Sequence, residues 1–153
     1  MSRRPGDTTS VPSAPPTPSF IRPALGLLAG LGIFVLAYAV PVLVGTLVML
    51  QGVTDPAAYQ PPPRFQLFNL IVGALAGVAS GWLVARMTIG RSWYTLLLLA
   101  LILCVSPLAE ARRAAASGQA YQLLIALAVV SPAGALLGGW LERRRTMAAS
   151  APG

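Results

Sequence analysis

The sequence predicts an all-α integral membrane protein with four transmembrane helices, arranged as two hairpins. Hydrophobic residues make up 56% of the 153 residues and charged residues only 10%, whereas soluble domains carry about 25% charged residues. The apolar residues form long blocks rather than an amphipathic pattern, which disfavours a soluble protein with an oily core. Four of these blocks approach or exceed the roughly 20 residues that cross a bilayer, and arginines gather at their ends.

The first block follows a polar segment. Residues 1–22 are rich in Pro, Ser and Thr and predict a disordered cytoplasmic tail. Residues 24–50 contain no charge and predict the first span. The alternative is a signal peptide cleaved after Ala39, because Ala37-Tyr38-Ala39 has the A-x-A form. The long polar lead-in and the apolar run that continues to Leu50 favour a retained helix.

Three further spans are predicted, at residues 66–86, 93–109 and 121–141. The segment between the first two spans contains Asp55-Pro56 and three consecutive prolines, which predict a loop outside the bilayer. Residues 110–120 predict a second loop on the same side. The transmembrane domain therefore covers residues 23–145, and residues 146–153 predict a short disordered tail.

The arginines predict the orientation. Four spans place both termini on one side, where eight of the eleven arginines lie. The positive-inside rule makes that side cytoplasmic, and the Arg-only usage with abundant Ala, Gly and Pro suggests a bacterial inner membrane. The three tryptophans fall at the same level, where an indole ring prefers the interface. The predicted interface anchors are Trp82, Trp93, Trp140, Arg86, Arg91, Arg143, Arg144 and Arg145.

One phrase occurs twice, in the second and the fourth span. The second span runs from Phe65-Gln66-Leu67 to Gly81-Trp82-Leu83, and the fourth from Tyr121-Gln122-Leu123 to Gly139-Trp140-Leu141. Both spans run from outside to inside, so the two hairpins form a candidate parallel repeat about an axis along the membrane normal. Convergence is the alternative, since any helix that runs inward tends to end with Trp and then Arg.

The span ends carry a resemblance. Gly81-Trp82-Leu83-Val84-Ala85-Arg86 has the form Gly-Trp-x-x-Ala-Arg. At this ending, and in its four-span layout, the chain resembles uncharacterised small bacterial inner-membrane proteins with paired helical hairpins. The resemblance covers roughly residues 24 to 145. It implies a fold but no activity and no ligand.

Glycines recur every four residues along three of the spans, which places them on one stripe of each helix. Such stripes favour close helix packing in lipid, where little hydrophobic drive brings helices together. The candidate helix-packing residues are Gly26, Gly30, Gly73, Gly77, Gly81, Gly134 and Gly138. We expect spans 1, 2 and 4 to pack tightly and the glycine-free third span to lie more toward lipid. Homo-oligomerisation through a stripe remains the alternative.

The sequence lacks the residues that several kinds of chemistry require. The chain has no His, one Cys and four acids, so no metal site, cofactor site or catalytic constellation is predicted. Every Asp, Glu and Arg lies at or beyond the end of a predicted span, so the chain has no counterpart of the membrane-embedded glutamate on which the small multidrug exporters depend. The arginines flank apolar blocks, which disfavours nucleic-acid binding.

A few neutral polar residues lie inside the predicted spans. Asn69 and Ser80 are candidates for a polar path, although such groups more often bond a neighbouring helix. Pro41, Pro107 and Pro132 fall toward the outer ends of their spans, and bent helices there predict an outward cavity.

These observations favour a non-enzymatic, polytopic membrane protein that serves as an interaction or structural component. Its expected partners are the lipid bilayer and either a second copy or another membrane protein. The alternative is a small transporter or channel subunit that acts as an oligomer.

Overall fold

The computed structural model describes residues 20–51, 61–88, 92–116 and 121–149. Within these ranges the chain is all-helical: α1 (Ile21–Leu50), α2 (Pro63–Met87), α3 (Ser92–Ala116) and α4 (Gln122–Ala149). Each helix is long and apolar enough to cross a membrane. This is the pattern of a multi-pass membrane protein. The shortest helices have 25 residues and rise about 37 Å, more than the roughly 30 Å of hydrocarbon in a bilayer.

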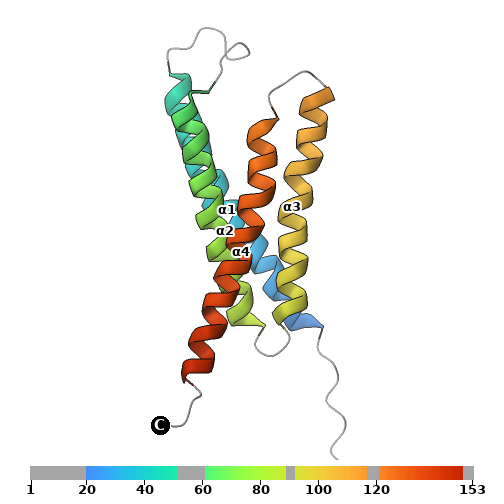
Figure 1. Ribbon diagram of the computed structural model, residues 1–153. Helices are drawn as coiled ribbons and strands as arrows, with labels where there is room; N and C mark the ends of the chain where they lie inside the picture. The colour runs from blue at the N-terminus through green and yellow to red at the C-terminus, as the bar shows by residue number, and fades with distance from the viewer. Residues whose placement is uncertain (1–19, 52–60, 89–91, 117–120, 150–153) are drawn as a thin grey trace, which may run out of the picture.

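The helices run alternately up and down along one axis (Figure 1). The start of α1, the end of α2, the start of α3 and the end of α4 lie together at the lower end of the bundle, hereafter the inner end. The most extensive packing joins α2 and α4, while α1 packs along α2 and α3 packs along α4. Toward the opposite, outer end, the α1–α2 pair diverges from the α3–α4 pair.

The helix ends follow local chemistry. Pro62 precedes α2 in an extended conformation, and Pro63 occupies the first turn, where its missing N–H leaves no bond unmade. At the other end of α2, the Thr88 hydroxyl donates to the Val84 carbonyl at 2.6 Å, and the Thr88 backbone N–H donates to the same oxygen at 3.0 Å. A carbonyl that the helix leaves free is thereby satisfied.

Two helices continue beyond the predicted spans. The third span was expected to end at Ala109, but α3 continues to Ala116 and carries residues 110–116 that were assigned to a loop. The fourth was expected to end at Leu141, but α4 continues to Ala149, so residues 146–149 are helical. Apolarity marks where a helix leaves lipid and not where it ends, and Ala, Arg and Glu are good helix formers in water.

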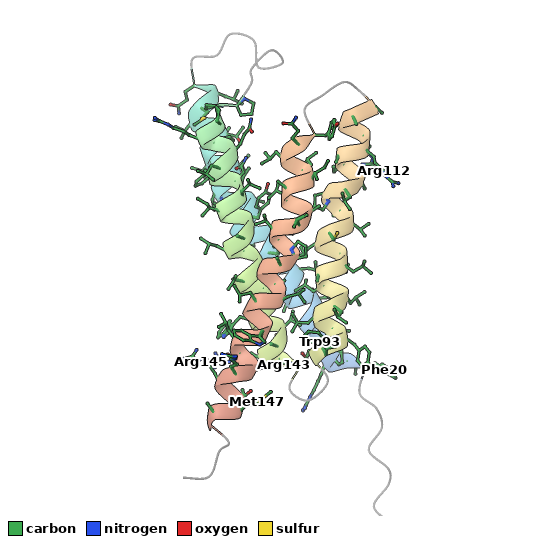
Figure 2. All side chains as sticks on the ribbon, viewed as in Figure 1. Phe20, Trp93, Arg112, Arg143, Arg145 and Met147 are labelled. Carbon is green, nitrogen blue, oxygen red and sulfur yellow. The ribbon has the colours of Figure 1, made fainter. Side chains whose placement is uncertain are left out.

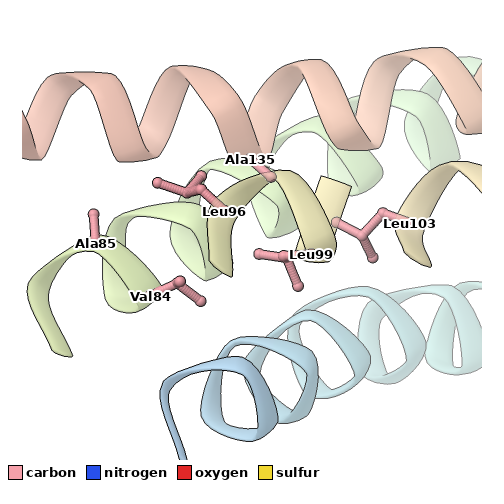
Figure 3. Packing of buried hydrophobic residues seen from close by; sticks show 6 residues of the cluster. All are labelled: Val84, Ala85, Leu96, Leu99, Leu103 and Ala135. Atoms are coloured by element: carbon pink, nitrogen blue, oxygen red, sulfur yellow. The ribbon is translucent and has the colours of Figure 1, made fainter. Parts of the chain in front are cut away.

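The expectation that the third span is the most peripheral is wrong. Leu96, Leu99 and Leu103 of α3 are all at most 5% exposed and form the core cluster with Val84 and Ala85 of α2 and Ala135 of α4 (Figure 3). In α1 only Gly26 and Gly30 are buried, and α1 makes no contact region with α4. Large leucines fill the space beside the small residues of α2 and α4, which a glycine-free helix is suited to do.

The close approach of α2 and α4 predicts a sharp difference between two glycines. A Cβ added at Gly81 would meet the backbone carbonyl of Ala135, which cannot rotate away, whereas nothing lies within 4 Å of one added at Gly32. We expect Gly81→Ala to destabilise the fold by about 1–3 kcal/mol through overpacking. Gly32→Ala, on α1, serves as the matched control and should leave stability unchanged or slightly raised.

Thermal unfolding of the purified variants in a mild detergent measures this difference. Equal unfolding temperatures for Gly81→Ala and Gly32→Ala would show that α2 and α4 do not approach so closely.

Candidate functional site

The glycines of α2 and α4 lie between these two helices. Cβ atoms added at Gly77 and Gly81 would meet the carbonyls of Ser131 and Ala135 respectively. In return, a Cβ at Gly134 would lie 2.5 Å from the Ala74 carbonyl oxygen, and one at Gly138 would meet the Val78 carbonyl. At these four positions the backbones of α2 and α4 are in direct contact. Only glycine permits such an approach, because any side chain would displace a backbone rather than a rotamer.

The remaining helix-packing candidates face side chains instead of backbone. A Cβ at Gly73 would lie 2.7 Å from Leu127 and 3.2 Å from the Ser131 hydroxyl. In α1, a Cβ at Gly26 would lie 2.6 Å from the Thr88 methyl group, and one at Gly30 would meet Val84. At these two glycines α1 therefore packs closely against the inner half of α2.

Each tryptophan is paired with an arginine at the inner end of the bundle. The guanidinium of Arg86 lies 5.2 Å from the ring centroid of Trp82, and that of Arg144 lies 3.9 Å from Trp140. Both pairs join residues four apart on one helix, a spacing that places their side chains on the same face. Cation–π attraction adds to the interface preference of each residue.

The third pair links two helices. The guanidinium of Arg143, on α4, lies 5.2 Å from the ring centroid of Trp93, at the start of α3 (Figure 2). Sequence spacing does not reveal this contact, because 50 positions separate the two residues. The sequence predicted only that both residues lie at the same end of their helices. Arg145 is exposed, and Arg91 lies outside the described residues.

The two candidates for a polar path lie far apart. Ser80 is fully buried and donates its hydroxyl to the Gly77 carbonyl at 2.8 Å, so its bond closes within α2. Asn69 is 6% exposed, and its Oδ1 accepts no hydrogen bond from the described residues. Eleven positions along α2, about 16 Å, separate them. Buried Gly73, Ala76 and Gly77 lie between, so the structure does not bring the two polar groups together.

A cavity of about 290 Å³ lies between α1, α3 and α4, which we call the central cleft. Its polar groups are the hydroxyls of Tyr38, Ser106 and Ser131. The remaining lining residues are apolar: Leu31, Phe34, Val35, Ile102, Leu103, Pro107, Leu124 and Leu127. An outward cavity was expected where the prolines bend the helices. Pro107 does line the central cleft, whereas Pro41 and Pro132 do not.

The chemistry of the central cleft is that of a neutral binding surface. No carboxylate, guanidinium or thiol is among its lining residues. Among the described residues no three His, Cys, Asp or Glu lie close enough together to hold a metal ion. Three hydroxyls offer hydrogen bonds within an apolar wall. Such an arrangement suits an apolar molecule or side-chain surface with a few polar groups.

The contact between Trp93 and Arg143 predicts an energetic coupling between α3 and α4. We expect Arg143→Gln to lower stability by about 0.5–1 kcal/mol, the range of exposed cation–π pairs. Arg145→Gln removes the same charge from an exposed site and should have a smaller effect.

A double-mutant cycle with Trp93→Leu isolates the pair, measured by thermal unfolding in lipid nanodiscs. In the Trp93→Leu background, the loss of stability caused by Arg143→Gln should be smaller than in the unsubstituted chain by the contribution of the pair, about 0.5–1 kcal/mol. Strictly additive effects of Arg143→Gln and Trp93→Leu would argue against the coupling.

The central cleft, between α1, α3 and α4, is lined only by apolar residues and three hydroxyls. Comparison with protein-family models, with curated proteins and with solved structures finds no match for this chain. Its function is therefore inferred from its own residues.

Proposed function

We propose that this chain is a non-enzymatic multi-pass membrane protein, an interaction or structural component of a bacterial inner membrane. The observation that carries the proposal is the central cleft, whose wall is built from three helices and offers only apolar groups and hydroxyls. Such a wall recognises another membrane component by shape and hydrogen bonding. Its hydroxyls have no histidine, carboxylate or lysine beside them among the lining residues to activate them as nucleophiles.

The character of the buried polar groups supports the same proposal. Proton and ion carriers place ionisable residues inside the membrane, where they are costly and functional. Among the described residues the buried polar side chains are Asn69, Ser80, Thr88, Thr95 and Ser131, all of them neutral. The acids and arginines of α2, α3 and α4 lie in the terminal turns or beyond the apolar stretches. No charge relay crosses the described part of the bundle.

A small transporter or channel subunit acting as an oligomer is the second candidate. The hydroxyls of Tyr38, Ser106 and Ser131 favour it, since together they line one cavity rather than scattered sites. An oligomer that aligned several such cavities would provide a neutral polar path. The extensive apolar wall weighs against this function for a charged solute.

We further propose that both chain ends are cytoplasmic and that the two hairpins are a parallel repeat. The arginine excess and the tryptophans at the inner end support the orientation. If Gly81 corresponds to Gly139, then Gly73 corresponds to Ser131 and Gly77 to Ala135. The two residues of each pair also lie close together. A Cβ added at Gly73 would lie 3.2 Å from the Ser131 hydroxyl oxygen, and one added at Gly77 would lie 3.2 Å from the Ala135 backbone nitrogen. Contact between equivalent positions is what a twofold axis along the helices requires.

Reporter fusions test the orientation. Alkaline phosphatase folds into an active enzyme only outside the cytoplasm, so a fusion after Gly153 should be inactive. A fusion after Gly52, in the segment between α1 and α2, should be active. The reverse pattern would place the arginine-rich end outside and contradict the proposal.

Site-specific photocrosslinking tests the interaction function. A photoreactive amino acid at Leu124, in the central cleft, should give a discrete protein adduct in native membranes. The same amino acid at Leu75, which is 64% exposed on α2, is the control and should give lipid adducts only.

Lipid adducts alone at both positions would argue against a protein partner in the central cleft. Solute flux in proteoliposomes that Ser131→Leu abolishes would instead favour the transporter.

A further inference from the structure

A second hollow lies between α3 and α4, toward the outer end of the bundle, and we call it the outer groove. Its volume is about 500 Å³, and its lining residues are Val105, Leu108, Ala109, Ala111, Arg112, Ala115, Tyr121 and Ile125. It shares none of these residues with the central cleft. The proposed function does not use it.

The outer groove has a polar end and an apolar end. Arg112 and Tyr121 lie toward the outer ends of α3 and α4, and Val105 lies seven positions deeper than Arg112 along α3, about 10 Å. Ile125 lies one turn deeper than Tyr121 along α4. In a bilayer this gradient runs from the headgroup level into the hydrocarbon. A molecule that matches it carries a polar group at one end and an apolar chain at the other.

The charge at the polar end specifies the headgroup. Arg113 is paired, since its guanidinium lies 2.7 Å from the carboxylate of Glu110. No such pair involves Arg112 among the described residues, and its exposed side chain is among those that line the outer groove. Figure 2 shows Arg112 on the outer half of α3, with its side chain projecting outward from the helix. A guanidinium presents a planar fork of donors that matches phosphate oxygens. The two adjacent arginines therefore differ. The charge of Arg113 is paired with Glu110 on the same helix, whereas the charge of Arg112 is available to bind an anion.

We propose that the outer groove binds an anionic phospholipid. Its acyl chain lies against Val105, Leu108 and Ile125, and its phosphate meets the guanidinium of Arg112 beside the Tyr121 ring. On the cytoplasmic side of membranes, basic pockets between transmembrane helices bind lipid headgroups by this combination of charge and apolar contact, and a guanidinium binds phosphate oxygens in the same way at either face.

Native mass spectrometry of the full chain, released from mild detergent with added lipid, tests the proposal. Three probes distinguish the contribution of the phosphate from that of the acyl chains: phosphatidylglycerol, diacylglycerol with the same acyl chains, and inorganic phosphate. We expect retained phosphatidylglycerol, diacylglycerol bound about ten-fold more weakly, and no retained phosphate, since charge-assisted hydrogen bonds contribute about this much. Equal retention of diacylglycerol would refute a phosphate site. Retention of phosphate alone would refute a lipid site.

Neighbouring residues provide the matched variants. Arg112→Gln should weaken phosphatidylglycerol binding about ten-fold, whereas Arg113→Gln removes the same charge from the paired residue and should leave binding within about two-fold. Ala109→Leu fills the apolar part of the outer groove and should reduce both lipids. Unfolding temperatures of all three exposed-site variants verify that the fold is kept. Equal losses from Arg112→Gln and Arg113→Gln would overturn the proposal, because they would indicate a general effect of charge.

Discussion

The contact between the backbones of α2 and α4 is the constraint on which the other packing depends. At Gly77, Gly81, Gly134 and Gly138 there is no room for even one methyl group. Lipid offers little hydrophobic drive for helix association, so dispersion between closely apposed backbones must hold the bundle. Since the glycines alternate with small residues such as Ala74 and Ala135, the contact extends along a considerable length of both helices.

The other two helices are placed by this central pair. On one side, α3 inserts Leu96, Leu99 and Leu103 beside the small residues, and a Cβ at Gly139 would collide with Leu96. On the other side, α1 rests its glycines on α2. Because α1 and α4 share no contact region, a gap opens between them, and the central cleft occupies it. The cleft is thus a consequence of which helices touch.

The polar chemistry is divided between the two ends of the bundle. The inner end holds the three Arg–Trp pairs, one of which joins α4 to α3. The outer end holds the outer groove with Arg112 and the salt bridge beside it. The central cleft between them is lined by apolar residues and by the hydroxyls of Tyr38, Ser106 and Ser131. The proposed interaction with another membrane component is based on this wall.

The sequence by itself determined the helical class, the four helices long and apolar enough to cross a membrane, and the position of the tryptophans and their paired arginines at one end of the bundle. Those properties depend on block length, backbone hydrogen bonding in lipid and the interface preference of single side chains, all of which are local. The glycine spacing also marked one face on each of three helices. Only the tertiary structure decided that α3 is more buried than α1, that Trp93 meets Arg143, and that α1 and α4 leave a cleft. Which glycine stripe packs against which helix depends on contacts between segments that are distant in the sequence. A periodic pattern along one helix does not specify the helix that it contacts.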